Sequence, residues 1–386
     1  MFQKSLIKIL EATKGKSIII VSAGLHGKEL AGALIDRDRE VRCFFDNKEE
    51  LWGLDIFGIP IKKPFNANSD DVCYVISVFD EVLRYVLKRQ LAGLGIPEES
   101  VLCYFPARCL DFHATLLPEE YRGEIDEMFR EKFGRSMDWE NPKTYSEKIN
   151  WEKLNVYDDR FKILTDKSQA RNWVGERIGT EHLTKHYGVW NNLDEIDFSK
   201  LPKSFVLKAN NASGRNILVR DKEKLNISEI KDKVDYWMST NYMFHKFENV
   251  YDGIEPKMIA EEYLEGMAET LYDYNIYCFH GKPKYIWCIK GSHKPECTAA
   301  FYDTDWNRQP FSYGYPLDIY PAPKPEKLEE MLELTKILCR DFRHVRVDWY
   351  IMPDGRILFG EMTFQTWSGL DTFIPEKYDE YFGSLI

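Results

Sequence analysis

The amino-acid sequence predicts a protein of mixed α and β structure, with a small parallel α/β domain first and a larger α+β region after it. Near the N-terminus, short apolar runs rich in β-branched residues alternate with helical segments. A helix-rich stretch follows over 118–200, and the chain becomes strand-rich after Pro202. For 386 residues, a prior of about 150 residues per domain predicts two or three domains.

The first predicted domain covers residues 1–110. Its predicted elements are strands over 17–23, 40–47 and 70–79 and helices over 24–36 and 81–95. A glycine-containing turn, Ala-Gly-Leu-His-Gly-Lys, joins the first strand to the first helix. Strands that alternate with helices in this way are typical of a Rossmann-like parallel sheet.

The rest of the chain places helices before strands. Helices are predicted over 118–134, 141–155 and 166–179, and a later one over 324–342. Strands are predicted over 204–210, 216–220, 257–264, 274–281, 282–291, 344–352 and 355–364. Pro353, Asp354 and Gly355 predict a tight hairpin between the last two strands.

Composition argues against several classes of protein. The chain has 52 Lys and Arg against 63 Asp and Glu, a net charge of -11, and no basic run, so nucleic-acid binding is not expected. No apolar run approaches the about 18 residues of a membrane span. Eight cysteines without a C-x-x-C pair, and no apolar leader segment, predict reduced thiols in a cytoplasmic protein.

His182 and His186 are four residues apart without a third ligand, which favours a surface helix over a metal site.

Lys208 ends an apolar strand and is followed by a run of small residues, Ala-Asn-Asn-Ala-Ser-Gly. Small residues let backbone N–H groups approach phosphate oxygens closely, and a neighbouring lysine supplies positive charge. This pattern is consistent with a nucleotide-phosphate site. Taken alone, it fits a hairpin turn with a solvated lysine better.

Asp348 and Glu361 lie within apolar runs on the two strands of the predicted hairpin. Buried carboxylates are costly unless they are paired or bound to a metal, and Mg²⁺ prefers oxygen ligands. Arg346 lies two residues before Asp348 and therefore on the same face of its strand. The pattern predicts a magnesium and phosphate site; the alternative is an ordinary buried salt bridge between Asp348 and Arg346.

The Lys208 loop, the motif E-E-Y-L-E-G and the hairpin that carries Asp348 and Glu361 follow one another along the chain. In this order they resemble the ATP-grasp superfamily. The closest resemblance is to its TupA-like branch, which acts in teichuronopeptide and related surface-polysaccharide biosynthesis. It extends over about 125–371 and is carried by LTDKSQARNWV, FVLKANNASG, IAEEYLEG, HVRVDWYIMPDGRILFGEMTF and TWSGL. The resemblance implies a helical linker or the start of the ATP-grasp region over 111–165, and an ATP-grasp domain over 166–386 with two α+β subdomains that grip ATP.

The resemblance also implies a role for each matching residue toward the phosphates. Lys167 would bind the α-phosphate, and Lys208 would be the second nucleotide lysine. Ser213 and Gly214 would lie in the loop over the phosphates.

Adenine would be held by four consecutive residues: Glu261, Glu262, Tyr263 and Leu264. Asp273 or Glu269 would contact the ribose. Asp348 and Glu361 would be the Mg²⁺ ligands, and Arg346 would contact the transferred phosphate. Many ATP-grasp enzymes have Asn two residues after the metal glutamate, whereas this chain has Thr363, which leaves open whether one or two metals bind.

The N-terminal domain resembles the nucleotide-sugar-binding domain of bacterial sugar N-acetyltransferases. That resemblance implies a ligand site at Gly24, His26, Gly27, Lys28 and Asp46, where a helix N-terminus suits a pyrophosphate. The alternatives are a structural or dimerising domain without ligand, and NAD binding.

The resulting hypothesis is an ATP- and Mg²⁺-dependent ligase that joins an amine to a carboxylate through an acyl phosphate. A uronic acid of a capsule or cell-surface glycan is the expected carboxylate, and other polysaccharide-assembly enzymes are the expected protein partners. A kinase on the same fold and a nucleotide-sugar-binding scaffold protein are the alternatives.

Overall fold

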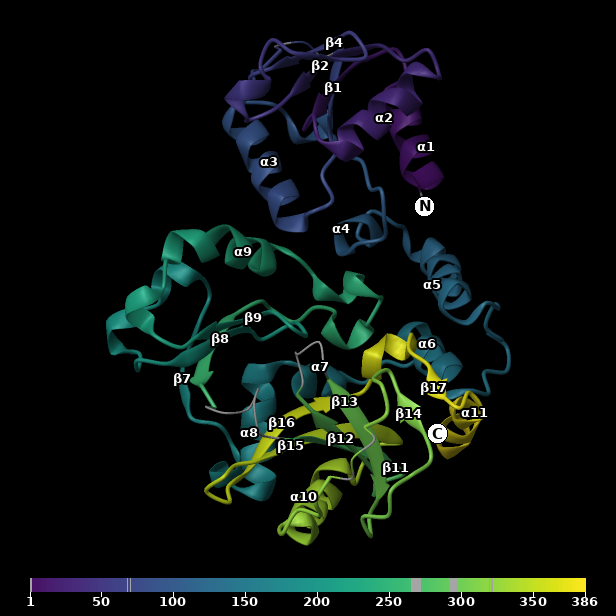
Figure 1. Ribbon diagram of the computed structural model, residues 1–386, viewed down its shortest axis with the longest axis vertical. Coiled ribbons are helices and arrows are strands. Elements are labelled where there is room, and N and C mark those ends of the chain that lie inside the picture. The colour runs from purple at the N-terminus through teal and green to yellow at the C-terminus, as the bar shows by residue number, and fades with distance from the viewer. Residues whose placement is uncertain are drawn as a thin grey trace. The chain divides into compact units, whose positions relative to one another are not determined.

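The computed structural model describes residues 2–67, 69, 71–264, 272–291, 297–318, 320 and 322–386 (Figure 1). The chain divides into two compact units. The first comprises Met1–Thr115 with Ile227–Tyr236, and the second comprises Leu116–Asn226 with Trp237–Ile386.

The first unit is built on a six-stranded sheet in the order β3-β4-β2-β1-β5-β6. The strands are β1 Ser17–Val21, β2 Val41–Phe45, β3 Asp55–Ile56, β4 Ile59–Lys62, β5 Val72–Ile76 and β6 Val101–Cys103. All neighbouring strands pair in parallel except β3, which is antiparallel to β4. The helices are α1 Phe2–Ala12, α2 Leu25–Ile35, α3 Glu81–Gly93 and α4 Leu110–His113. The predicted parallel α/β sheet is confirmed; α1, α4, β3, β4 and β6 were not predicted.

Both faces of this sheet are covered, as in other parallel sheets. Along β1, Ile18 and Ile20 pack into one apolar cluster, whereas Ile19 and Val21 pack into another. This explains why the strand reads as a continuous apolar run instead of an alternating one. The first ten residues of α9 (Ile227–Ser239) also belong to this unit, where the Tyr236 hydroxyl donates a 3.0 Å hydrogen bond to Asp111.

The second unit contains two larger antiparallel sheets. One has the order β7-β10-β8-β9, with β7 His186–Trp190, β8 Phe205–Ala209, β9 Asn216–Val219 and β10 Met258–Glu262. The other has the order β13-β12-β11-β15-β16, with β11 Tyr272–Phe279, β12 Lys282–Lys290, β13 Thr298–Asp303, β15 His344–Ile351 and β16 Ile357–Thr363. A short pair joins β14 (Ser312–Tyr313) to β17 (Phe373–Ile374). The helices are α5 Pro118–Phe133, α6 Tyr145–Asn155, α7 Asp159–Thr165, α8 Lys167–Ile178, α10 Leu328–Cys339 and α11 Lys377–Leu385.

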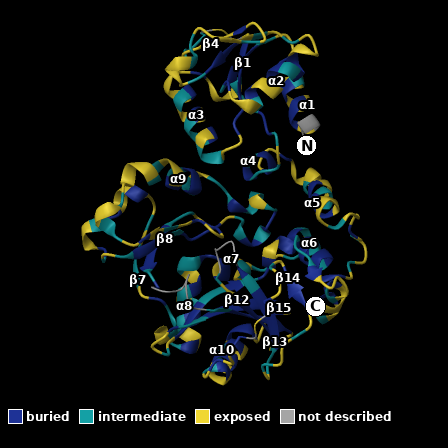
Figure 2. Ribbon diagram, viewed as in Figure 1, coloured by how far each residue is buried: buried dark blue, intermediate teal, exposed yellow. Residues whose placement is uncertain are grey.

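The five-stranded sheet has two different faces. Val345, Val347 and Trp349 of β15 point into an apolar core that also contains Leu328 and Met331 of α10, and these strands are largely buried (Figure 2). Arg346 and Asp348 alternate with the apolar residues and therefore lie on the opposite face. The fold thus places charged groups on a largely buried sheet.

The hairpin predicted at Pro353, Asp354 and Gly355 is confirmed. The Gly355 N–H donates to the Met352 carbonyl, and Gly355 has a φ of 83°, which a glycine adopts without strain. The expected surface helix around His182 and His186 is wrong. His182 ends a short 3₁₀ turn and His186 begins β7, because this strand pairs with β10.

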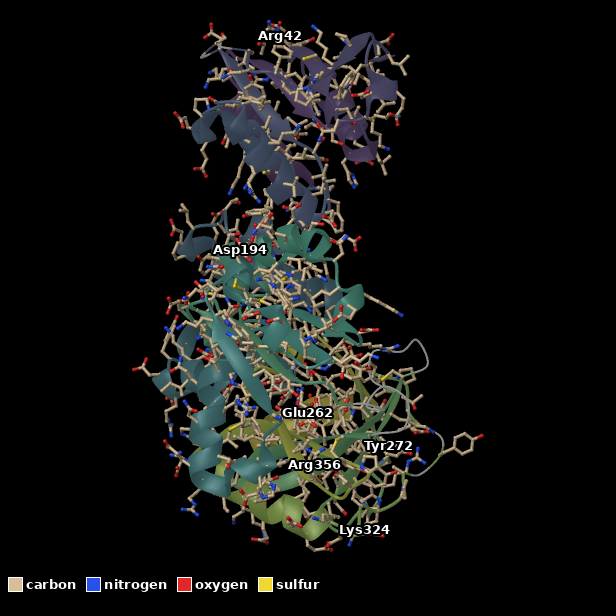
Figure 3. The ribbon with its side chains drawn as sticks, turned by 90° about the vertical axis from the view of Figure 1, so that its left-hand side faces the viewer. Arg42, Asp194, Glu262, Tyr272, Lys324 and Arg356 are labelled. Carbon is tan, nitrogen blue, oxygen red and sulfur yellow. The ribbon has the colours of Figure 1, made fainter. Side chains whose placement is uncertain are left out.

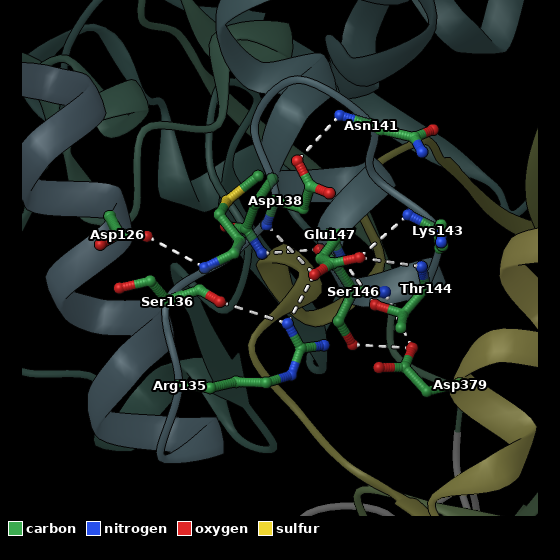
Figure 4. A network of polar contacts seen from close by, with 12 residues as sticks. Asp126, Arg135, Ser136, Asp138, Asn141, Lys143, Thr144, Ser146, Glu147 and Asp379 are labelled. Atoms are coloured by element: carbon green, nitrogen blue, oxygen red, sulfur yellow. Dashed lines mark hydrogen bonds and ion pairs between the residues drawn. The ribbon is translucent and has the colours of Figure 1, made fainter.

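A polar network fixes the start of α6 (Figure 4). The Glu147 carboxylate accepts hydrogen bonds from Arg135 and from the backbone N–H groups of Asp138, Lys143 and Thr144. Burial raises the pKa of Glu147, but Arg135 and these N–H groups lower it below its ordinary value. The helix is therefore anchored at its N-terminus.

Candidate nucleotide and metal site

The two hairpin carboxylates share one cation. Arg346 donates two hydrogen bonds to Asp348, from Nε at 2.7 Å and from Nη2 at 2.6 Å. The same Nη2 lies 3.1 Å from Glu361 Oε1 and 3.1 Å from the Thr363 hydroxyl, and that hydroxyl donates to Glu361 at 2.7 Å. Asp348, Glu361 and Arg346 therefore form one cluster, as their spacing on the hairpin predicts.

Burial and charge oppose each other within this cluster. Burial raises the pKa of Asp348 to about 7 despite the opposing effect of Arg346. Burial also raises the pKa of Glu361, but Arg346 and Lys167 lower it overall. Asp348 and Arg346 are paired, and Arg346 remains the cation of the pair because its pKa is raised well above its ordinary value.

Lys208 lies on β8 and contacts the carboxylate of Glu261 on β10. The distance from Lys208 Nζ to Glu261 Oε2 is 2.6 Å, and Arg171 of α8 lies 3.5 Å from Glu261 Oε1. Burial raises the pKa of Glu261, but Lys208 and Arg171 lower it overall. The register of β7 and β10 places His186 opposite Glu261.

Lys167 contacts the loop of small residues after Lys208 and interacts electrostatically with Glu361 of the hairpin. It is the first residue of α8, its Nζ donates a 2.5 Å hydrogen bond to the Ala212 carbonyl, and its N–H donates to the Asn210 carbonyl. Burial lowers the pKa of Lys167, and Glu361 is the strongest of the charges that oppose this effect. The resemblance alone had placed Lys167 in the site, and the structure places it within electrostatic range of Glu361 and Lys208.

The loop of small residues connects β8 to β9. Ser213 and Gly214 are exposed at its tip, and Gly214 has a φ of 70°. The loop closes through a hydrogen bond from the Ala209 N–H to the Arg215 carbonyl. Its backbone is therefore accessible from solvent next to Lys167.

The residues predicted to hold the nucleoside are spread over β10, its end, and β11. Glu262 lies 3.6 Å from Arg356 of the hairpin (Figure 3), Tyr263 accepts a hydrogen bond from Arg220, and Leu264 packs on Met352 and Leu358. Asp273 lies opposite Tyr350 in the register of β11 and β15. Glu269 lies outside the described residues.

The donor set suits a hard cation that also binds phosphate. Among the described residues, no group of three or more His, Cys, Asp or Glu side chains is arranged to hold a metal. Asp348 and Glu361 supply carboxylate oxygens, and Mg²⁺ usually takes one or two carboxylates together with substrate phosphates. The residues present therefore fit Mg²⁺ bound with a nucleotide.

Comparison with protein families identifies this part of the chain. A family model described as TupA-like ATP-grasp matches residues 147–386, which is more than half of the sequence. The chain belongs to the TupA-like ATP-grasp family. No curated protein matches the chain.

Solved structures with detectable similarity include two ligases from Bacillus species. The L-amino acid ligase from Bacillus licheniformis is 13% identical, with a TM-score of 0.34 over 90% of this chain and 68% of that chain. The D-alanine–D-alanine ligase from Bacillus anthracis, complexed with ATP, is 13% identical, with a TM-score of 0.33 over 90% of this chain and 84% of that chain.

The TupA-like chain also contains buried charges that sequence reasoning missed. Lys153 donates to Asn150 at 2.8 Å, and Glu248 accepts from the Ser368 hydroxyl. Lys153 and Glu248 interact electrostatically, and Glu248 also interacts with Glu361. The segment SEKINWEKL contains Lys153. Its many charged residues are typical of a solvated helix, so the sequence does not reveal that Lys153 is buried.

The N-terminal unit of this ATP-grasp chain has its own glycine turn. Ser22 has a φ of 91°, and a Cβ on Gly27 would lie 2.1 Å from the Ser22 carbonyl oxygen. Asp46 accepts a 2.9 Å hydrogen bond from the Ala23 N–H, and His26 Nδ1 lies 2.9 Å from Glu29. The turn therefore requires glycine at position 27 and is held by Asp46.

Gly24 is the N-cap residue of α2, and the exposed Lys28 lies in its first turn. The structure thus gathers Gly24, His26, Gly27, Lys28 and Asp46 at the carboxyl ends of β1 and β2. Among the described residues, no helix is both long and apolar enough to cross a bilayer.

Proposed function

We propose that the protein is an ATP-dependent ligase that forms an amide bond through an acyl phosphate. The supporting observation is the grouping of two lysines, one arginine and two carboxylates on neighbouring elements of the second unit. Phosphoryl transfer depends mainly on positioning and charge neutralisation, and this arrangement offers both.

The proposed nucleotide contacts follow the resemblance to ATP-grasp proteins. Lys167 and Lys208 bind phosphate oxygens, with Ser213 and Gly214 covering them from the loop. Residues 261–264 hold the adenine, and Asp273 contacts the ribose.

Asp348 and Glu361 would hold Mg²⁺, which supplies charge neutralisation at the phosphates when bound. Arg346 already joins these carboxylates in one cluster. It would orient the transferred phosphoryl group opposite the acceptor carboxylate, whose oxygen attacks the γ-phosphorus while ADP departs. An amine then displaces phosphate from the acyl carbon.

A uronic acid of a surface polysaccharide is the proposed acceptor, and the first unit is proposed to bind a nucleotide sugar at Gly24, His26, Gly27, Lys28 and Asp46. This unit has a parallel sheet with a helix N-terminus at the turn, which suits a pyrophosphate.

An ADP-release screen of uronic acids and nucleotide uronates against amino acids tests the proposal. Ligation requires both a carboxylate and an amine for sustained turnover. ADP release with a single hydroxyl acceptor would show that the protein is a kinase and not a ligase. If the protein binds no ATP, both enzyme hypotheses fail and the nucleotide-sugar-binding scaffold is the remaining one.

A further inference from the structure

An aromatic cluster lies on the face of the five-stranded sheet that carries Asp348. Trp287 lies opposite Asn275, and Asn275 lies opposite Asp348, in the registers of β12, β11 and β15. Directly opposed residues of antiparallel strands share a face, and neighbouring strands are about 4.8 Å apart. The Trp287 backbone is therefore about 10 Å from that of Asp348, two strand spacings across the same face.

Two further aromatic residues cover Trp287. Tyr315 stacks on it with ring centroids 5.7 Å apart, and Trp367 meets it at 6.1 Å. Trp367 and Tyr315 contact each other edge to face at 5.0 Å and 88°. Trp287 is 0% exposed, whereas Trp367 is 37% exposed. The outer layer of the cluster is thus a partly open indole surface beside Tyr315.

The backbone that carries this indole is strained. Trp367 has a φ of 50° and Ser368 a φ of 58°, both in the left-handed region that side chains other than glycine rarely adopt. A bulky aromatic residue persists there only where surrounding contacts enforce the conformation, and such positions cluster at ligand sites.

Buried hydrogen bonds provide this enforcement. Asn150 of α6 donates to the Gly369 carbonyl at 2.7 Å, and the Ser368 hydroxyl donates to Glu248. A Cβ on Gly369 would lie 2.8 Å from Asn150 Nδ2 and 2.9 Å from Ile149 Cβ. The turn 366–369 is therefore locked against α6, with Trp367 directed to the aromatic cluster.

A carboxylate lies beside the indole. The position of a Cβ on Gly314 is 3.3 Å from Asp371 Oδ2 and 3.4 Å from Trp367 Cη2, so the two side chains converge there. Asp371 Oδ1 is 3.0 Å from Lys132 Nζ. Tyr315 is also within electrostatic range of Arg346 and Asp273. The cluster thus combines the aromatic surface of Trp367 and Tyr315 with the carboxylate of Asp371, and it extends toward Arg346.

We propose that Trp367 and Tyr315 form the acceptor subsite and bind a saccharide ring whose carboxylate points to Arg346. The C–H bonds of a pyranose carry partial positive charge and suit the negative face of an indole. Asp371 accepts a hydrogen bond from a ring hydroxyl. This inference rests on the proposed ligase function, and it names the side chains that would bind the uronic acid proposed as acceptor.

Calorimetric titration of the full chain with sodium D-glucuronate and sodium D-galacturonate, with and without Mg-ADP, tests the subsite. Trp367→Ala should raise the dissociation constant at least tenfold, and Trp367→Phe should restore most of the affinity because it keeps an aromatic face. Mg-ADP affinity should change less than twofold. Tyr157→Ala, at a side chain that is 76% exposed in the same unit, is the matched control.

Unchanged uronate affinity in Trp367→Ala would overturn the proposal. So would a wild-type protein that binds Mg-ADP but neither uronate, and that result would leave the nucleotide site standing. A wild-type protein that binds a uronate through Trp367 but no nucleotide would instead overturn the proposed ligase function and keep the saccharide subsite.

Discussion

Lys208 and Glu261 are joined by a 2.6 Å hydrogen bond between neighbouring antiparallel strands. The pair holds the lysine ammonium beside the loop that starts at Ala209. A preorganised cation loses less conformational freedom on binding than a solvated lysine would lose. The bond thus supports the nucleotide-site interpretation of Lys208 over a solvated lysine in a hairpin turn.

Replacement of Lys208 by Met should weaken ATP binding at least tenfold, about 1.4 kcal/mol, because a phosphate loses its charged partner. Titration with a non-hydrolysable ATP analogue measures this change. Lys200→Met, at an exposed lysine paired with Asp197, is the control. Equal nucleotide affinity in the Lys208 variant would remove this lysine from the site.

Replacement of Glu361 by Gln should abolish ADP release while the fold persists. The amide keeps the side-chain shape but removes the negative charge proposed to hold Mg²⁺. ADP formation and thermal melting are measured together, and a stability loss of about 1 kcal/mol is expected from the weakened bond to Arg346. Full turnover in this variant would contradict the magnesium assignment.

Asp348→Asn should also abolish turnover, but at a larger cost in stability. The change leaves the buried Arg346 without its bidentate carboxylate partner, and breaking a buried pair costs about 3–5 kcal/mol. Urea unfolding should therefore rank wild type above Glu361→Gln, and Glu361→Gln above Asp348→Asn. The reverse order of the two variants would mean that Glu361, not Asp348, is the main partner of Arg346.

Lys28→Ala should lower the affinity of the full chain for UDP-glucuronate without changing its affinity for ATP. Lys28 is exposed in the first turn of α2, next to the glycine turn, and belongs to a different unit from the residues proposed to bind ATP. Calorimetry with each ligand separates the two effects, and Lys14→Ala controls for the loss of one surface charge. If wild type shows no heat of binding with UDP-glucuronate, the nucleotide-sugar proposal fails.

The free energy of unfolding should depend on pH through Lys153. Burial lowers the pKa of Lys153 to about 7; Glu248 opposes this effect and Lys246 adds to it. Between that value and its unfolded pKa of about 10.4, the unfolded chain binds the extra proton, so stability rises with pH by up to about 1.4 kcal/mol per unit. Below about pH 7, Lys153 is protonated in both states and contributes no slope.

Lys153→Met should remove this gain. Urea unfolding of wild type and variant at about pH 7.5 and about pH 9.5 gives the difference directly. The free energy of unfolding of the variant, taken relative to that of wild type, should fall as pH rises, because wild type alone gains stability. A difference independent of pH would show that Lys153 stays protonated throughout this range.

Much of the fold and part of the site could be predicted because they depend on local patterns. Alternation of apolar residues and the Pro353–Gly355 turn fixed the hairpin, and a separation of two residues placed Arg346 on the face of Asp348. By contrast, Lys153 and Glu248 come from distant segments whose burial depends on tertiary packing. The four-residue spacing of His182 and His186 is typical of a helix, whereas His186 lies in β7 because that strand pairs with β10. No local pattern reveals this pairing.

The strand order of the five-stranded sheet has a consequence for how the site is assembled on the ribosome. β15 and β16 pair beside β11, although about sixty residues separate the end of β11 from the start of β15. Chains emerge at about 5–20 residues per second, so residues 209–214 and the two lysines proposed to bind ATP leave the ribosome seconds before Asp348 and Glu361 are synthesised. Under the proposed function, the growing chain has an incomplete site and transfers no phosphoryl group until β15 and β16 pair beside β11.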